Sequence, residues 1–273
     1  MKKLAIFFLV ITAISAQAQE TLHFKTRFRE NATYTHRIEN ESTTSMTYEA
    51  SPEMLQALKE QGIANPTIQN ESSMIAMTMK TGKQENNTIP IVMDMDLGDK
   101  IEGFNGKLKV LGSVRTDGQP EFTSVEGEGL GEDFKEAFLT TVQSMLSQIK
   151  IPDVTLKVGE SYVQKLPLSI PLGPISMDMT NSTTYILKRI EAGKAYLDII
   201  HDFDMTTSTS GAGLDSEGSG SGKGTGTLVF DIKESYITKM ENDITMDFNY
   251  ATEVVQLKIQ ARTIQKNDAS IAY

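Results

Sequence analysis

Apolar and polar residues alternate almost strictly from Met240 to Tyr250, and this alternation constrains the fold more than any other feature of the chain. The even-numbered positions are mostly apolar: Met240, Asn242, Ile244, Met246, Phe248 and Tyr250. The odd-numbered positions are all polar: Glu241, Asp243, Thr245, Asp247 and Asn249. Successive side chains on a β-strand point to opposite faces of the sheet. The segment is therefore predicted to be a long strand with one buried face and one hydrated, acidic face.

The same period of two recurs along the chain, at 34–38, 75–79, 91–97, 175–187, 195–205 and 255–261. Asp117-Gly118 is a hairpin signal between the apolar runs 108–114 and 122–125. Strands with one polar face favour antiparallel pairing, because buried parallel strands are apolar on both faces. We expect a mainly β (α+β) fold: a large curved antiparallel sheet, or half-open β-barrel, of about ten to twelve strands wrapped around one or two helices.

Two segments have helical rather than strand periodicity. Ser51 and Pro52 form an N-cap and first-turn signal for a short helix that ends near Gly62. The second helix is predicted from Gly131 to about Lys150, with apolar residues three and four positions apart. Its apolar stripe needs a partner, and the apolar side of the sheet is the large surface available.

The first eighteen residues resemble a secretory signal peptide. Lys2 and Lys3 precede an apolar run, and Ala16-Gln17-Ala18 supplies the small-x-small cleavage pattern. We expect cleavage near Ala18, a single β-rich domain over 19–273, and a periplasmic or secreted location. No later segment is long and apolar enough to predict a transmembrane helix in the mature chain.

Residues 206–226 are rich in glycine, serine and threonine. This composition predicts a long hairpin with a flexible tip over 206–226. A second interpretation is that the alternation of glycine with polar residues extends two strand ends. A phosphate-binding loop is excluded, because Glu217 and Gly224 stand where that motif requires glycine and serine or threonine.

Composition excludes several classes of function. The net charge of −10 argues against a nucleic-acid partner, and the absence of cysteine excludes disulfides, a thiol nucleophile and a cysteine-ligated metal. His23, His36 and His201 are far apart in sequence, and we interpret His36 and His201 as semi-buried, hydrogen-bonded side chains. We therefore expect no enzyme activity, no catalytic residue, no metal site and no cofactor.

The fourteen methionines are the most informative excess in the composition. Pairs two residues apart on a strand place both thioethers on one face. Three interpretations stay open: methionine filling gaps in a packed core, methionine lining a deformable apolar cavity, and thioether binding of Cu(I), which no histidine or cysteine in the same runs supports. The candidate cavity residues are Met77, Met79, Met93, Met95, Phe134, Phe138, Met145, Met177, Met179, Met246 and Phe248.

The element Val158-Gly159-Glu160-Ser161-Tyr162, together with the signal peptide, the long strands and the middle helix, resembles a family of uncharacterised exported bacterial proteins. The pattern is also similar to the LolA/LolB-like lipoprotein carriers. That resemblance implies a half-open β-barrel that shelters lipid chains, and the missing N-terminal cysteine agrees with the soluble LolA type. It implies no catalytic residue.

These observations predict a soluble, exported envelope protein without enzyme activity. It would bind a lipid or another apolar small molecule in a methionine-rich cavity between sheet and helix, with envelope proteins as further partners. The alternative is a structural or protein-interaction module of the cell envelope with a filled core. A hydrolase ranks third, because no nucleophile with its base is recognisable.

Overall fold

The computed structural model describes residues 21–96, 106–115, 118, 120–148, 152–172, 175–209, 217–251 and 255–273. The predicted signal peptide, 1–18, lies outside the described residues. The helices are α2 (Pro52–Glu60) and α3 (Glu132–Gln148). The strands are β1 (Thr21–Phe24), β2 (Thr33–Ala50), β3 (Thr67–Thr81), β4 (Thr88–Asp96), β5 (Lys107–Arg115), β6 (Pro120–Glu126), β7 (Val154–Lys157), β8 (Ser161–Leu172), β9 (Ile175–Glu191), β10 (Lys194–Thr209), β11 (Glu217–Asp231), β12 (Tyr236–Ala251) and β13 (Val255–Ala272).

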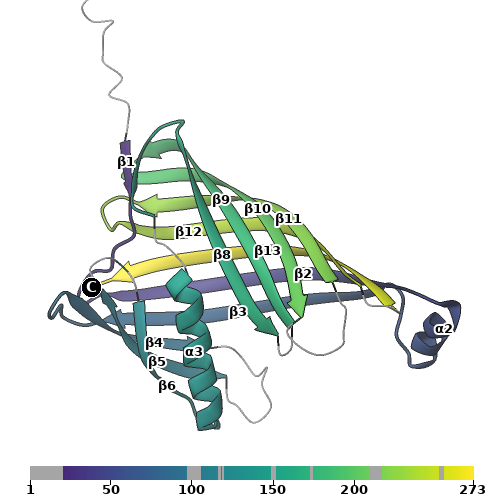
Figure 1. Cartoon of the computed structure of the whole chain (residues 1–273). Helices are drawn as coiled ribbons and strands as arrows, with labels where there is room; N and C mark the ends of the chain where they lie inside the picture. The colour runs from purple at the N-terminus through teal and green to yellow at the C-terminus, as the bar shows by residue number, and fades with distance from the viewer. Residues whose placement is uncertain are drawn as a thin grey trace, which may run out of the picture.

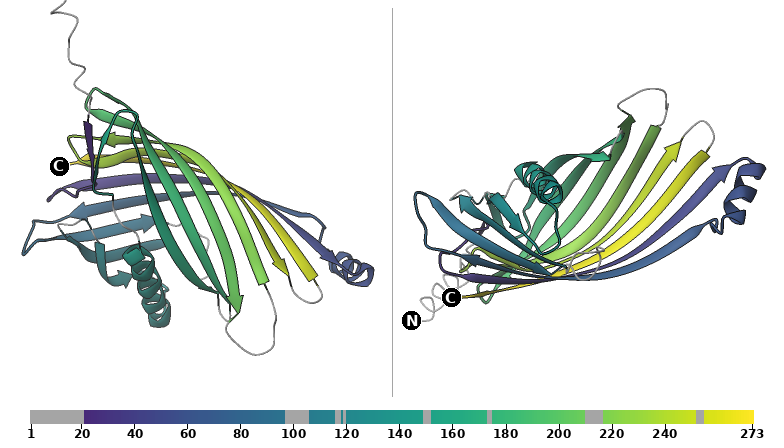
Figure 2. Two further views of the ribbon diagram at one scale, coloured as in Figure 1. Left: turned by 45° about the horizontal axis from the view of Figure 1, so that its top comes forward. Right: turned by 90° about the horizontal axis from the view of Figure 1, so that it is seen from below.

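Among the described residues, eleven strands form one antiparallel sheet in the order β6-β5-β4-β3-β2-β13-β12-β11-β10-β9-β8, and β1 pairs with β7 (Figure 1). The prediction of a mainly β fold with a large antiparallel sheet is confirmed. The sheet stays open, because β6 and β8 are its two edges. It curves into a trough, and α3 lies over the concave side, in contact with both edge strands (Figure 2).

Both predicted helices are present. The Ser51 hydroxyl accepts a hydrogen bond from the Met54 amide (3.3 Å) and caps α2, with Pro52 in its first turn. α3 is held against the edge of the sheet, where the Gln143 side chain accepts a hydrogen bond from the Phe122 amide (3.0 Å) of β6. Neither helix is long and apolar enough to cross a membrane.

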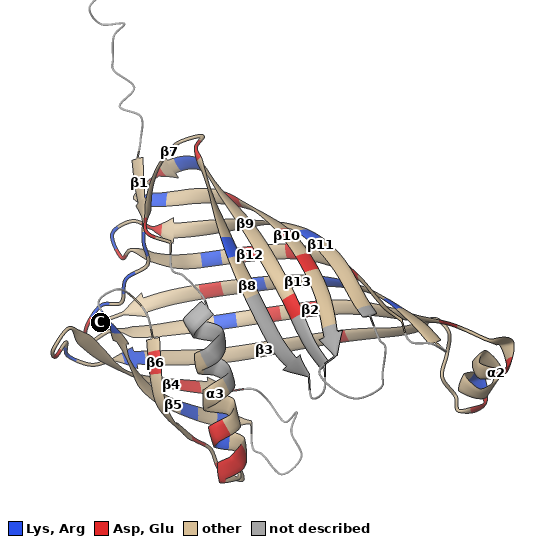
Figure 3. Ribbon diagram, in the orientation of Figure 1, with Lys and Arg blue, Asp and Glu red and all other residues tan. Residues whose placement is uncertain are grey.

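The two faces of the sheet differ sharply in polarity. Charged residues are distributed along the long strands (Figure 3), and several on the convex face are ion-paired across strands. Arg262 of β13, for example, donates two hydrogen bonds to Asp243 of β12 (2.9 and 2.7 Å). The concave face carries the side chains that the alternation in the sequence predicts to be apolar. The alternation from Met240 to Tyr250 therefore sets which face of β12 points into the trough.

The buried core lies at one end of the concave face, which we call the proximal half. Near β1 and β7, Phe24 packs edge-on against Phe230 (ring centroids 5.3 Å apart), together with Leu22, Leu156 and Leu197. Two further clusters of buried apolar residues lie under the N-terminal end of β2 and under α3: Ala32, Tyr34, Met79, Ile91, Val114 and Tyr236, and Leu108, Val110 and Val125.

The glycine-rich segment forms a crease in the sheet. Gly218, Gly220, Gly222, Gly224 and Gly226 all lie on the concave face of β11, paired with residues of β10 and β12. A Cβ at Gly222 would lie 2.7 Å from the Met246 side chain, and one at Gly220 would lie 2.8 Å from the Phe248 ring. Bulky neighbours therefore occupy the space above the glycines.

The strands on either side of β11 also approach each other. Some Cα atoms of β10 and β12 lie within 8 Å of one another, whereas strands separated by one flat strand are about 9.5 Å apart. Residues 206–209 belong to β10 and 217–226 to β11, and the two strands pair antiparallel as in the predicted long hairpin. Residues 210–216, on which the prediction of a flexible tip now depends, lie outside the described residues.

Candidate functional site

The register of β3 and β4 assembles four of the candidate methionines. Met77 pairs with Met95, and Met79 pairs with Met93, all on the concave face. Cβ atoms of directly opposed residues lie about 4.5–5.5 Å apart in antiparallel sheets. We call these residues the four-methionine cluster. Met79 is buried, and the other three are half-buried.

The helix α3 lies beside this cluster. Phe138 and Leu139 of α3 pack against Leu108, Val110 and Val125, the same buried residues that Met93 and Met95 contact. Phe134 stacks on Phe138 (centroids 6.3 Å apart) but is 42% exposed, so it does not line a buried cavity. The side chains of Met145 and Met177 lie outside the described residues.

The remaining candidates lie elsewhere on the concave face. Met246 and Phe248 of β12 meet Phe203 and Met205 of β10 above the crease, and Met179 pairs with Met205. Among the described residues, α3 contacts the edge strands β6 and β8. The described candidates thus fall into two groups on the concave face, one on β3 and β4 and one on β9, β10 and β12.

The second group belongs to a larger apolar surface at the end of the trough away from the core, which we call the distal apolar face. Its side chains are apolar or aromatic, and most are half-buried. The members are Met46, Tyr48, Met179, Phe203, Met205, Met246, Phe248, Tyr250, Leu257 and Ile259. Phe203 and Met205 are the two buried members of the distal apolar face.

A buried polar group separates the core from the distal apolar face. His201 donates from Nε2 to Asn242 Oδ1 (3.2 Å), its Nδ1 pairs with the Thr183 hydroxyl (3.1 Å), and its ring stacks on Phe203. Burial lowers the pKa of His201 below its ordinary value, although the hydrogen bond to Asn242 opposes this shift. His201 is therefore neutral at pH 7.

His36 has a similar environment in the proximal half. Its Nδ1 donates to Asn267 Oδ1 (3.3 Å), and its Nε2 accepts a hydrogen bond from the Tyr236 hydroxyl (2.9 Å). Burial lowers the pKa of His36 and raises that of Tyr236. The interpretation of His36 and His201 as hydrogen-bonded, semi-buried side chains is confirmed. In the part of the chain that the structure describes, no three His, Cys, Asp or Glu side chains converge as metal ligands.

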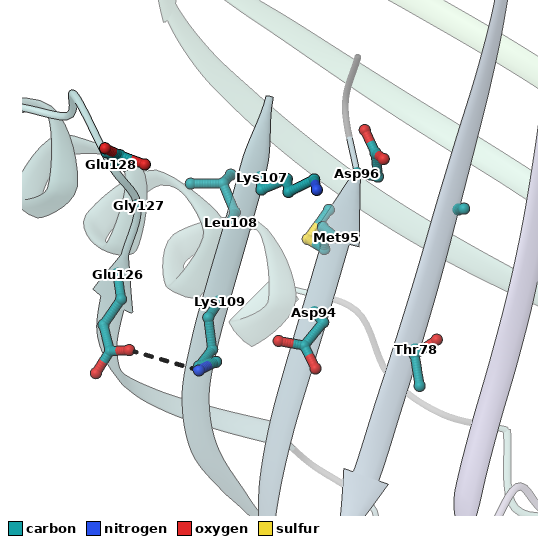
Figure 4. A pocket seen from close by; sticks show the side chains of 11 residues that line it. Thr78, Asp94, Met95, Asp96, Lys107, Leu108, Lys109, Glu126, Gly127 and Glu128 are labelled. Carbon is teal, nitrogen blue, oxygen red and sulfur yellow. Dashed lines mark ion pairs between the residues drawn. The ribbon is translucent and has the colours of Figure 1, made fainter. Parts of the chain in front are cut away.

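Two of the open pockets among the described residues have charged side chains at their rims, and the first also has Met95 of the four-methionine cluster in its wall. One, of about 570 Å³, lies at the ends of β4, β5 and β6, where Lys109 lies between Glu126 and Asp94 (Figure 4). The Lys109–Glu126 ion pair measures 4.0 Å. The other, of about 540 Å³, lies on the convex face over β11, with Ile200 and Ile264 on its walls. Both are shallow and rimmed by paired charges, an arrangement that fits surface hydration better than a specific ligand.

Comparison with known proteins gives no family. No protein-family model matches the chain, and no curated protein matches it. Among solved structures, it is similar to a protein from Bacteroides fragilis described as exported, with a YmcC-like fold, at 10% identity over 85% of this chain and 99% of that one (TM-score 0.25). It also matches Ail, the attachment invasion locus protein of Yersinia pestis (4% identity, 88% and 99% covered, TM-score 0.17), and OpdQ of Pseudomonas aeruginosa (6% identity, 89% and 98% covered, TM-score 0.29).

These matches correct the resemblance drawn from the sequence. The similar structures are a YmcC-like exported protein and outer-membrane proteins, not LolA/LolB-like carriers, so that assignment is wrong. Alternating strands and one amphipathic helix are common to many curled antiparallel sheets, and they do not distinguish one family from another. TM-scores this low carry no argument about function.

Proposed function

We propose that this chain is an exported, non-enzymatic protein of the cell envelope that binds an elongated lipid on its distal apolar face. One observation carries the proposal: the concave face continues apolar beyond the packed core, and there most of its side chains keep part of their surface in solvent. Contiguous exposed apolar surface on a folded protein often marks a binding site.

The polarity of the sheet supports an internal rather than an external apolar site. The convex face is charged and ion-paired, as in the bidentate Arg262–Asp243 contact and the Lys239–Glu241 contact (2.8 Å). The convex face is therefore well solvated, whereas the concave trough offers apolar surface to a ligand. Covering the trough with a hydrocarbon chain would remove apolar surface from water at about 25 cal/mol per Å².

The dimensions of the trough also fit an acyl chain. Along β12, the apolar parity runs from Ile244 to Tyr250, six steps of about 3.4 Å, or about 20 Å. An acyl chain spans about 15 Å, half of the roughly 30 Å hydrocarbon core of a bilayer. Methionine and aromatic side chains adapt to a flexible chain better than β-branched ones.

Lipid binding can be tested by native mass spectrometry of the purified protein and by titration with a fluorescent fatty acid. We expect a co-purified lipid and saturable uptake. Phe248→Ser and Ile259→Ser should each weaken uptake at least fivefold. Ile200→Ser on the convex face is the matched control, because it removes a similar apolar surface from the opposite side of the sheet.

Two results would contradict the proposal. One is the repeated absence of lipid together with no fatty-acid uptake, which would favour the alternative of an interaction module that recruits envelope proteins. The other is equal loss of uptake in Ile200→Ser and Phe248→Ser, which would place the effect in general stability rather than in the distal apolar face.

A further inference from the structure

We propose that the four-methionine cluster binds one Cu(I) ion through its thioether sulfurs. This inference goes beyond lipid binding and concerns a different part of the concave face. The sequence shows two pairs of methionines in separate segments, whereas the register joins them into one patch with Met77 opposite Met95 and Met79 opposite Met93.

The geometry of the cluster suits a sulfur-only site. Opposed Cβ atoms lie about 4.5–5.5 Å apart, and residues two apart on one strand lie about 6.8 Å apart. Each methionine side chain has three rotatable bonds, so sulfurs from the four corners of this patch can converge on one ion above its centre. Three of the four side chains are half-buried, which leaves an ion a route from solvent.

The choice of residue type is unusual for packing alone. β-branched residues are favoured in strands. Several neighbouring core positions are β-branched (Ile91, Val110, Val114, Val125), whereas Leu108 opposite Met95 and Tyr34 opposite Met79 are not. Methionine loses more rotamer freedom on burial than isoleucine or leucine does. Four adjacent methionines therefore form a poorer hydrophobic cluster than their neighbours and a better set of soft ligands.

The surroundings favour a soft monovalent ion over zinc. His36 lies opposite Met77, but both of its ring nitrogens are hydrogen-bonded, to Asn267 and to Tyr236. The described cluster thus offers neutral thioethers, which select Cu(I). Zinc prefers thiolate, imidazole and carboxylate ligands.

The test is anaerobic titration of the purified protein with Cu(I) in competition with bicinchoninate. We expect one equivalent of Cu(I) to be retained, with X-ray absorption showing sulfur alone in the nearest shell. The quadruple variant M77L/M79L/M93L/M95L should bind at least 100-fold more weakly. Leucine keeps a similar apolar volume, and urea unfolding checks that the variant folds. The double variant M240L/M246L, on β12, is the matched control and should retain Cu(I).

If the quadruple variant does not fold, M77L/M95L replaces it, with an expected loss of at least tenfold. The proposal is overturned if the wild-type protein yields its Cu(I) fully to the competitor, if the nearest shell contains nitrogen or oxygen, or if the leucine variants bind as tightly as the wild type. Fatty-acid uptake by the quadruple variant should be unchanged, so failure of either proposal can be recognised separately.

Discussion

The proximal and distal halves of the concave face are built from the same alternating strands, yet within the part of the chain that the structure describes only the proximal half has a covering layer. In the proximal half, β1, β7 and α3 lie over the sheet and bury residues such as Phe230 and Val110. In the distal half, side chains from β10 and β12 approach one another above the crease in β11. Alternation thus decides which face of a strand is apolar, but elements outside the sheet decide whether that face becomes core.

The largest expected effect compares one phenylalanine from each half. Phe230→Ala should lower the free energy of unfolding by about 3–5 kcal/mol, because Phe230 is 1% exposed and packs against Phe24. Phe248→Ala should cost only about 1–2 kcal/mol, because its ring is half-buried. Urea unfolding of both variants measures the difference. Equal losses would show that the distal half is also a closed core.

The crease in β11 offers the next test. Gly222→Val places a Cβ about 2.7 Å from Met246 and should destabilise the protein by about 1–3 kcal/mol through overpacking. Ser221→Val on the convex face of the same strand is the control, and we expect its unfolding midpoint to stay near that of the wild type. If both variants behave alike, the crease does not depend on the absence of side chains.

The buried histidines of the two halves, His36 and His201, should make the stability of the protein depend on pH. Burial holds the pKa of His36 and His201 below the unfolded value of about 6.5. The unfolded chain therefore binds more protons as the pH falls through about 6.5, and stability decreases from pH 7.5 to 5.5 by at most about 1.4 kcal/mol per pH unit for each histidine. Urea midpoints of His36→Gln/His201→Gln should vary less with pH than those of the wild type. An unchanged slope would contradict this account.

The smallest effect is expected on the convex face. Arg262→Gln removes the bidentate contact with Asp243, but both groups are solvated. We expect a shift in the urea midpoint smaller than those of the Phe230, Phe248 and Gly222 variants. It should disappear in 1 M salt, where the Debye screening length is about 3 Å. A large, salt-independent loss would indicate that the convex face contributes to the packing of the sheet.

Local signals in the sequence predicted local structure well. The alternation from Met240 to Tyr250 matches β12, and the cap at Ser51 matches the start of α2. For 206–226, composition predicts a flexible tip and the alternation of glycine with polar residues predicts strand ends; the structure extends β10 and β11 into this segment. The covering of the proximal half by α3 and β1 depends on tertiary packing, and no single segment encodes it.

The four-methionine cluster illustrates the same limit for the candidate site. From the sequence, each pair of methionines two residues apart is predicted to place both thioethers on one face of its strand. Which residue of 67–81 faces which residue of 88–96 depends on register, and register is set by the turn and by packing between strands. The pairing of Met77 with Met95 therefore could not be derived from either segment alone.

The place of β13 in the sheet has a consequence for the order of assembly. Of the described strands, this one comes last in the sequence, yet it lies between β12 and β2, with Ile259 paired to Met46 and Ile271 to Tyr34. During synthesis, β2 can complete this pairing only after the intervening residues 51–254 have been made. Such distant pairing makes folding slow, because a long stretch of chain must be ordered before the contacts between the two strands form.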